Sequence, residues 1–242
     1  TLRIMREAGC RVIRSRLASL ARKLSFTGRQ TPTPEGMKQQ LEAWRIPDPD
    51  REPWRQYING LAERLEEIGS AGVREHLETL GDWLDEAGAR LTRLTRLDPV
   101  IRYLRGNGLA AARIDIRQNS AYYETALCQT LQAAGMPEAS AYPDWPEDQR
   151  RAFLRAELTH PRPLTHPTME LPPQAHEVRE TFTVLAQHLK ERGSEGLGVL
   201  VVSMCRELSD LLVVYLLGKE TGLTVQSGGP DGGMRCRLPV VP

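Results

Sequence analysis

The sequence predicts a mostly α-helical protein with α/β elements: a helical region over residues 1–97, then residues 98–242 with strands, connecting helices and inserted helices. Apolar residues recur at intervals of three and four along most of the chain, which is the spacing of one face of an α-helix. The last third instead alternates apolar strand-like runs with a helical segment. That order indicates parallel strands joined by crossover helices.

The helical region begins with a predicted helix over Leu2–Leu24. A second helix starts at Thr33–Glu35, where a threonine N-cap precedes a proline at the first helical position, and a loop over Ile46–Asp50 follows. Apolar residues from Trp54 to Ile68 lie on one helical stripe, and those from Val73 to Leu94 repeat at alternating steps of four and three. This spacing fits an antiparallel helical hairpin or a short coiled coil, and we expect ordinary helix packing.

The second region opens with a short helix, Val100–Arg105, which is expected to end at Gly106–Gly108 because glycine favours the helix C-terminus. Ala111–Arg117 is predicted to be a strand, with Ile114 and Ile116 on one face and charged residues on the other. Three helices follow, separated by a proline-rich surface connection over residues 161–173, and they span Ser120–Ala134, Asp144–Leu158 and Ala175–Lys190.

Gly198–Ser203 is a continuous apolar run, which is typical of a strand buried on both faces. A helix capped by Ser209 is expected to continue to Glu220 and to stop at a glycine. Arg235–Val241 is predicted to be a third strand. The glycine-rich segment Thr224–Gly233 before it is expected to be a mobile loop.

Charge and apolar patterning exclude several classes of protein. The net charge of the 242 residues is +1, which argues against binding to a polyanion on bulk charge. Residues 1–30 nevertheless hold eight Lys or Arg against one acid, so a basic helix that binds nucleic acid remains an alternative, beside a solvated face. The apolar runs fall short of the ~20 residues that a membrane helix needs. We therefore expect neither a nucleic-acid nor a membrane partner.

The four cysteines are widely scattered, which predicts buried, reduced thiols in a cytoplasmic protein. The five histidines show no metal-ligand spacing, and His76 is expected to be exposed because it lies one position from an apolar stripe. Arg117 is the candidate functional residue, because it lies at the carboxyl end of its predicted strand. Such a guanidinium can hold a phosphate or a carboxylate through two hydrogen bonds. The residues alone leave open a structural ion pair with a carboxylate such as Asp115.

Several segments in order resemble the phosphoenolpyruvate carboxylase family. The matching segments are Ala112–Ser120 (A-R-I-D-I-R-Q-N-S), Glu124–Leu127 (E-T-A-L), Tyr142–Trp145 (Y-P-D-W), Glu147–Leu158, Arg162–Leu164 (R-P-L), Val178–Thr181 (V-R-E-T), Leu197–Asp210, Lys219–Gly222 (K-E-T-G) and Leu238–Pro242 (L-P-V-V-P). Single matches are weak, but their common order is specific.

The resemblance implies that residues 98–242 hold the first strands of a TIM-type β/α barrel, incomplete in this chain. It also implies that phosphoenolpyruvate and bicarbonate give oxaloacetate and phosphate with Mg²⁺ or Mn²⁺, whose ligands lie outside this chain. Arg117 would contact the substrate phosphate. The family usually forms homotetramers. We expect the chain to be an internal part of a longer enzyme and to be inactive alone.

One short segment is similar to a family motif but lies in a different part of the chain. The family's catalytic histidine belongs to T-A-H-P-T-E, and Thr165–Thr168 (T-H-P-T) resembles it, but in a variable loop. We interpret His166 as a coincidence and expect His166→Ala to leave turnover nearly intact. The alternative to an enzyme is a non-catalytic helical scaffold or degenerate homologue that binds an anion or a protein partner.

Overall fold

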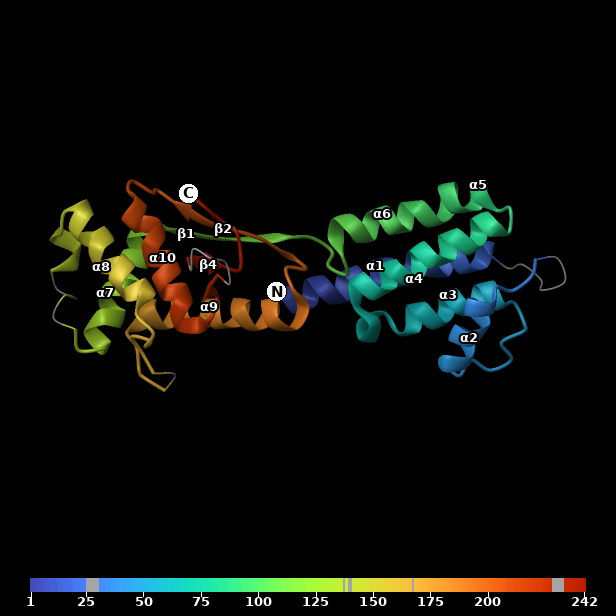
Figure 1. The fold of residues 1–242 in the computed structure, drawn as a ribbon, viewed down its shortest axis with the longest axis horizontal. Coiled ribbons are helices and arrows are strands. Elements are labelled where there is room, and N and C mark those ends of the chain that lie inside the picture. Colours follow the sequence, from blue (N-terminus) through green and yellow to red (C-terminus); the bar gives the residue numbers. More distant parts are fainter. Residues whose placement is uncertain (25–30, 137, 139–140, 167, 228–232) are drawn as a thin grey trace. The chain divides into compact units, whose positions relative to one another are not determined.

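The computed structural model describes residues 1–24, 31–136, 138, 141–166, 168–227 and 233–242. Within them the chain is mostly helical with a small parallel sheet, as predicted. It divides into two compact units, Thr1–Arg113 and Ile114–Pro242 (Figure 1). The boundary predicted between residues 97 and 98 lies inside the first unit, because α6 (Asp98–Asn107) packs on α4 (Leu65–Glu86).

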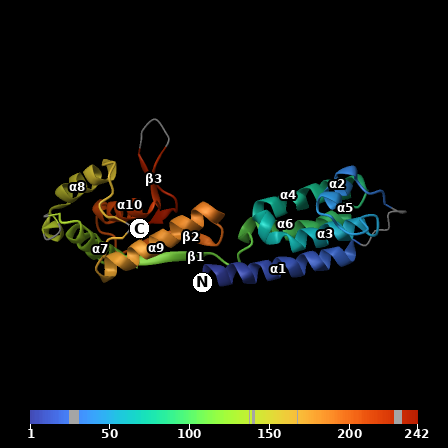
Figure 2. The ribbon, with the colours of Figure 1, turned by 90° about the horizontal axis from the view of Figure 1, so that it is seen from below.

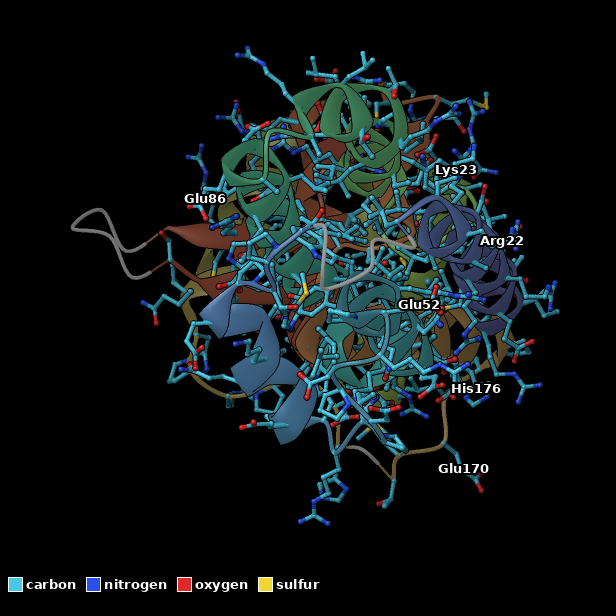
Figure 3. All side chains as sticks on the ribbon, turned by 90° about the vertical axis from the view of Figure 1, so that its right-hand side faces the viewer. Arg22, Lys23, Glu52, Glu86, Glu170 and His176 are labelled. Atoms are coloured by element: carbon cyan, nitrogen blue, oxygen red, sulfur yellow. The ribbon has the colours of Figure 1, made fainter. Side chains whose placement is uncertain are left out.

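The first unit is built from helices alone in its described residues. Its elements before α6 are α1 (Leu2–Lys23), α2 (Glu35–Ala43), α3 (Pro53–Glu63), α4, α5 (Arg90–Thr92) and the π-helix η1 (Arg93–Leu97). Helices α1 to α4 and α6 contribute their apolar stripes to one continuous core. The basic character predicted for α1 is carried on its outer face: Arg22 and Lys23 in its last turn are exposed (Figure 3).

Two of the long helical stripes predicted in this unit are interrupted. The helix predicted to reach Ile68 ends at Glu63, and Gly69, with a φ of 74°, breaks the start of α4. The stripe predicted to reach Leu94 stops at the end of α4, and Leu91 is 74% exposed. Gly88 has a φ of 71°, a conformation that glycine adopts without a Cβ clash, and it turns the chain out of the helix.

The prediction that His76 is exposed was wrong. The ring is half-buried, with Nδ1 2.7 Å from the Tyr57 hydroxyl oxygen and its centroid 5.2 Å from that of Trp44. Burial lowers the pKa of His76. His76 lies at the edge of the core, because the rings of Trp44, at the C-cap of α2, and Tyr57, on α3, pack against it.

The second unit contains a three-stranded parallel sheet and a separate hairpin. Its elements are β1 (Ile114–Asn119), α7 (Ser120–Ala133), η3 (Tyr142–Asp144), α8 (Glu147–Thr159), α9 (Pro173–Arg192), β2 (Leu197–Ser203), α10 (Leu208–Thr221), β3 (Thr224–Gln226), β4 (Met234–Cys236) and β5 (Val240–Val241). The sheet order is β1-β2-β5, and β3 pairs antiparallel with β4. Helices α7, α9 and α10 pack on one another beside the strands (Figure 2).

The strand predicted over Arg235–Val241 is two strands. Met234–Cys236 pairs with Thr224–Gln226, which had been expected to be loop, whereas Val240–Val241 pairs with β2. Pro239 lies between them and cannot donate a ladder hydrogen bond, so the chain leaves one sheet and joins the other there. The remainder of the predicted loop, residues 228–232, lies outside the described residues.

Two further predictions for this unit need correction. Ser209 does not cap α10: Glu207 is the N-cap, and its side chain and that of Asp210 form a capping box. Strand β2 is not buried on both faces: Leu197, Leu200 and Val202 are buried, the residues between them are only half-buried and Ser203 is exposed. The helical stop at Gly222, with a φ of 75°, is confirmed.

Three further features complete the description. None of the helices among the described residues combines the length and apolar character that crossing a bilayer requires. All four cysteines are free thiols. Cys10 and Cys236 are buried, as predicted, whereas Cys128 and Cys205 are only half-buried.

Candidate functional site

The carboxyl ends of β1 and β2 lie side by side in the second unit. The two strands are parallel, and Asn119 at the end of β1 is paired with Ser203 at the end of β2. The chain then turns into α7 after β1 and toward α10 after β2. In sheets of this kind, ligands bind at the carboxyl edge, because the connecting turns meet there.

Arg117 lies within β1 and is exposed. It is paired with Val201 of β2, and the strand continues two residues beyond the predicted end, to Asn119. Ile114 and Ile116 are half-buried and Asp115 is exposed, so the predicted alternation of faces is confirmed.

No ion pair to Arg117 is found among the residues that the structure describes. The Asp115 carboxylate, which had been considered as its structural partner, instead accepts the Val199 amide hydrogen at 3.0 Å. The guanidinium of Arg117 is therefore available to an anion from solution.

A pocket of about 120 Å³ opens beside this part of β1. Strand β1 and helices α7 and α9 line it with Ile116, Arg117, Gln118, Tyr122, Tyr123, Glu177, Val178, Thr181 and Phe182. Arg117 is the basic residue of the lining, and Glu177 is the acidic one. The Tyr122 hydroxyl donates to Glu177 Oε2 at 2.5 Å, and this hydrogen bond raises the pKa of Tyr122.

Polar contacts hold the turns at the sheet edge. Asn119 Oδ1 accepts the Tyr122 amide hydrogen at 2.7 Å and so caps α7. The Ser120 hydroxyl donates to the Met204 carbonyl at 2.9 Å, which joins the turn after β1 to the turn after β2. Asp210 Oδ2 accepts the Arg206 amide hydrogen at 2.8 Å. The edge is thereby fixed by side chains of both turns.

The loop that carries His166 is held by Glu220. The carboxylate of Glu220 accepts the amide hydrogens of Leu164 and Thr165 at 3.0 and 2.8 Å and the Thr165 hydroxyl at 2.9 Å. His166 is exposed, with Nδ1 2.9 Å from Thr168 Oγ1, and it does not line the pocket. The expectation that it is dispensable stays a prediction.

A divalent metal was expected to have its ligands elsewhere. In the part of the chain that the structure describes, no group of three or more His, Cys, Asp or Glu residues is placed to hold a metal ion. These residues do not by themselves fit a metal site.

Sequence reasoning assigned no site role to the other polar residues. Ser120 was predicted to begin the helix after the strand, and Asn119 directly before it is a typical N-cap residue. Tyr122 and Glu177 are 55 residues apart and meet only because α7 packs on α9. No local pattern signals such a pair.

Parallel strands joined by helices, with a pocket beside them that Arg117 and Glu177 help to line, place the second unit among α/β proteins. The sequence model of the phosphoenolpyruvate carboxylase family matches residues 68–242. The chain belongs to the phosphoenolpyruvate carboxylase family.

Individual relatives carry the same family description. A phosphoenolpyruvate carboxylase of Nocardia farcinica is 31% identical over 93% of this chain and 27% of its own length. One of Actinobacillus pleuropneumoniae is 37% identical over 57% of this chain and 15% of its own length. Phosphoenolpyruvate carboxylase 4 of Arabidopsis thaliana is 36% identical over 64% and 14%, respectively. The chain thus spans between 14% and 27% of these relatives.

Proposed function

We propose that the chain serves the carboxylation of phosphoenolpyruvate by bicarbonate, with Arg117 as the residue that binds the substrate phosphate. The observation that carries the proposal is the position of Arg117. It lies in the segment that resembles the family's phosphate-binding strand, is exposed, lines a pocket and has no ion pair among the described residues. A guanidinium without a carboxylate partner keeps its donors for a phosphate.

In this reaction bicarbonate attacks the phosphoryl group, giving carboxyphosphate and the enolate of pyruvate. Carbon dioxide released from carboxyphosphate is then attacked by the enolate. Arg117 would donate two parallel hydrogen bonds to phosphate oxygens, which orients the phosphoryl group and stabilises its negative charge. A divalent metal would be held by residues outside this chain and would supply further charge stabilisation. The Tyr122–Glu177 pair would hold the outer wall of the pocket in place.

The test replaces Arg117 in an active carboxylase that contains this chain. Arg117→Ala should lower kcat/KM by on the order of 10²–10³, as for loss of one charge-stabilising donor. Arg117→Lys should recover part of it, because an ammonium supplies the charge without the planar pair of donors. Arg155→Ala, which removes an exposed arginine of α8, is the matched control. Equal kinetics for Arg117→Ala and Arg155→Ala would remove Arg117 from the site.

We also propose that the 242 residues alone do not catalyse the reaction. The family residues that the resemblance expects for the metal and for the catalytic histidine are not among its matched segments. Oxaloacetate formed by the pure chain would be detected through NADH oxidation by malate dehydrogenase. A rate above the background of the Arg117→Ala chain would overturn this proposal.

The wider setting is proposed on the same basis. Residues 98–242 would supply the first strands of a TIM-type β/α barrel, which the parallel order β1-β2-β5 supports. The enzyme would act in the cytoplasm as a homotetramer on phosphoenolpyruvate and bicarbonate, with Mg²⁺ or Mn²⁺. The mass of the assembled enzyme in solution, measured by light scattering and divided by the mass of one subunit, would test the tetramer.

A further inference from the structure

Met204 has an unusual backbone conformation at the sheet edge. It directly follows β2, and its φ of 60° places it in the left-handed region, which residues with a Cβ rarely adopt. Its side chain is 79% exposed, the highest value among the exposed large apolar residues of the described chain. The fold therefore holds a strained residue with its thioether in solvent.

The conformation is fixed by its neighbours. The Ser120 hydroxyl donates to the Met204 carbonyl, and Asp210 accepts the amide hydrogens of Arg206 and Glu207. Ser120 and Asp210 are 3% and 4% exposed, so both anchors belong to the interior. Within these 242 residues, Met204 is thus exposed on an ordered turn.

The other methionines are better protected. The chain has six, and Met37 is fully buried, whereas Met5, Met136, Met169 and Met234 are half-buried. Oxidation of a thioether depends on access of the oxidant to the sulfur atom. The structure therefore ranks Met204 first in susceptibility.

We propose that Met204 is a site of reversible oxidation to methionine sulfoxide by hydrogen peroxide. The thioether sulfur attacks one peroxide oxygen, the O–O bond breaks and an S–O bond forms. Sulfur loses two electrons, and the second oxygen leaves as water with both peroxide protons. Methionine sulfoxide reductases reverse the change, so the site can cycle.

The adjacent Cys205 is the competitor for the same oxidant. Burial raises the pKa of the Cys205 thiol, and the charge of Asp210 raises it further. Its sulfur lies 3.1 Å from the Val202 carbonyl oxygen. The thiolate is the reactive form of cysteine, whereas a thioether has no proton to lose. Mildly acidic solution therefore slows oxidation of Cys205 and leaves that of Met204 unchanged.

Oxidation of Met204 should leave the fold intact, because an exposed side chain has little packing to lose. It does place a polar, hydrogen-bond-accepting S–O group at the edge where the turns after β1 and β2 meet. An effect on ligand binding beside Arg117 rests on the proposed function. The chemical modification itself does not.

The experiment treats the chain with hydrogen peroxide at about pH 6, where thiolate is scarce, then alkylates the thiols and maps peptides by tandem mass spectrometry. The peptide containing Met204 should gain one oxygen faster than the peptide containing Met37, by on the order of tenfold. Sulfoxide reductase should remove that oxygen. In Met204→Leu the peptide that contains residue 204 should gain no oxygen. In Met234→Leu the same peptide should gain one oxygen at the unchanged rate.

Oxidation of another methionine first, or an oxygen retained in Met204→Leu, would overturn the proposal. A separate arm measures phosphoenolpyruvate binding by calorimetry to untreated, oxidised and Met204→Gln chains, the last as a polar mimic. Weaker binding in both altered forms would extend the effect to the site. If no form binds the substrate, the extension of the effect to the site fails, while the mass spectra still decide the oxidation.

Discussion

The interiors of the two units differ in chemistry more than in size. In the residues that the structure describes, the first unit buries apolar side chains and no polar or charged ones. The second unit has a comparable apolar core and also contains all the buried polar or charged residues, which are Ser120, Thr130, Ser209, Asp210 and Thr224.

The difference follows from what each unit must position. Packed helices satisfy their backbone groups internally, so an apolar stripe is enough to hold them together. Turns that follow strands leave amide and carbonyl groups to be satisfied, and a buried group without a partner is costly. Ser120 and Asp210 serve this purpose in the turns after β1 and β2. Among the described residues, buried polar side chains thus occur in the unit that carries the candidate site.

The largest expected effect tests whether the first unit depends on apolar packing. Leu77→Ala, at a fully buried position of α4, should destabilise this unit by about 2–5 kcal/mol, because it leaves a cavity. Leu91→Ala is the matched control: Leu91 belongs to the same predicted stripe but is 74% exposed. It should change stability by less than about 0.5 kcal/mol.

Tryptophan fluorescence in urea can follow the first unit separately. Trp44, Trp54 and Trp83 lie in it, and the remaining tryptophan, Trp145, lies in the second unit. A Trp145→Phe background therefore confines the signal to the first unit. Equal urea midpoints for Leu77→Ala and Leu91→Ala would contradict the contrast between a buried and an exposed end of the stripe.

A smaller effect is expected from a polar anchor of the second unit. Glu220→Ala removes an acceptor of three hydrogen bonds from Leu164 and Thr165 and should destabilise the unit by about 1–3 kcal/mol. Glu180→Ala, at an exposed position of α9, should be nearly neutral. Thermal unfolding followed by circular dichroism measures both. Amide exchange at Leu164 and Thr165 should accelerate in the first variant only.

If Glu220→Ala left both exchange and melting unchanged, polar anchoring would be no part of the second unit's stability. The two interiors would then differ only in which residue types they bury, and not in what stabilises them. Glu220→Gln adds an intermediate case, because the glutamine amide keeps one acceptor oxygen. Its melting temperature should lie between those of the unchanged chain and Glu220→Ala.

Local periodicity was enough to predict most elements of both units. The strand with Arg117, the helix after it and the stop at Gly222 follow from alternation, capping residues and glycine conformation, which are set by near neighbours. One failure was local: Leu91 continued the α4 pattern, yet Gly88 ended the helix. The other depends on distant residues, because the segments on the two sides of Pro239 pair with different strands.

The site shows the same limit. Arg117 was predicted from its strand and from the family resemblance, which is local information. Its pocket depends on α9, and the Tyr122–Glu177 contact joins residues from two helices that only tertiary packing brings together. The strained turn at Met204 depends on Ser120, 84 residues earlier in the chain. Contacts of this range carry no periodic signal, so Arg117 could be predicted but the assembly of the pocket around it could not.

The smallest expected effect concerns pH and the edge of the apolar core in the first unit. His76 is the only histidine of Thr1–Arg113, and burial lowers its pKa, with the charge of Glu75 opposing the shift. Below the ordinary histidine pKa of about 6.5 the unfolded chain binds a proton that the folded unit resists. Stability of the first unit should therefore be level above that pH and decline as the pH falls below it.

The decline should disappear in His76→Gln, which cannot titrate, when urea midpoints are compared between about pH 5 and 7.5, above the range where carboxylates take up protons. The groups known to face His76 are the Tyr57 hydroxyl and the Trp44 ring, and neither changes charge in this interval. The Trp145→Phe background again restricts the signal to the first unit. A decline that persists in His76→Gln would mean that a group other than this half-buried ring links protonation to the apolar core.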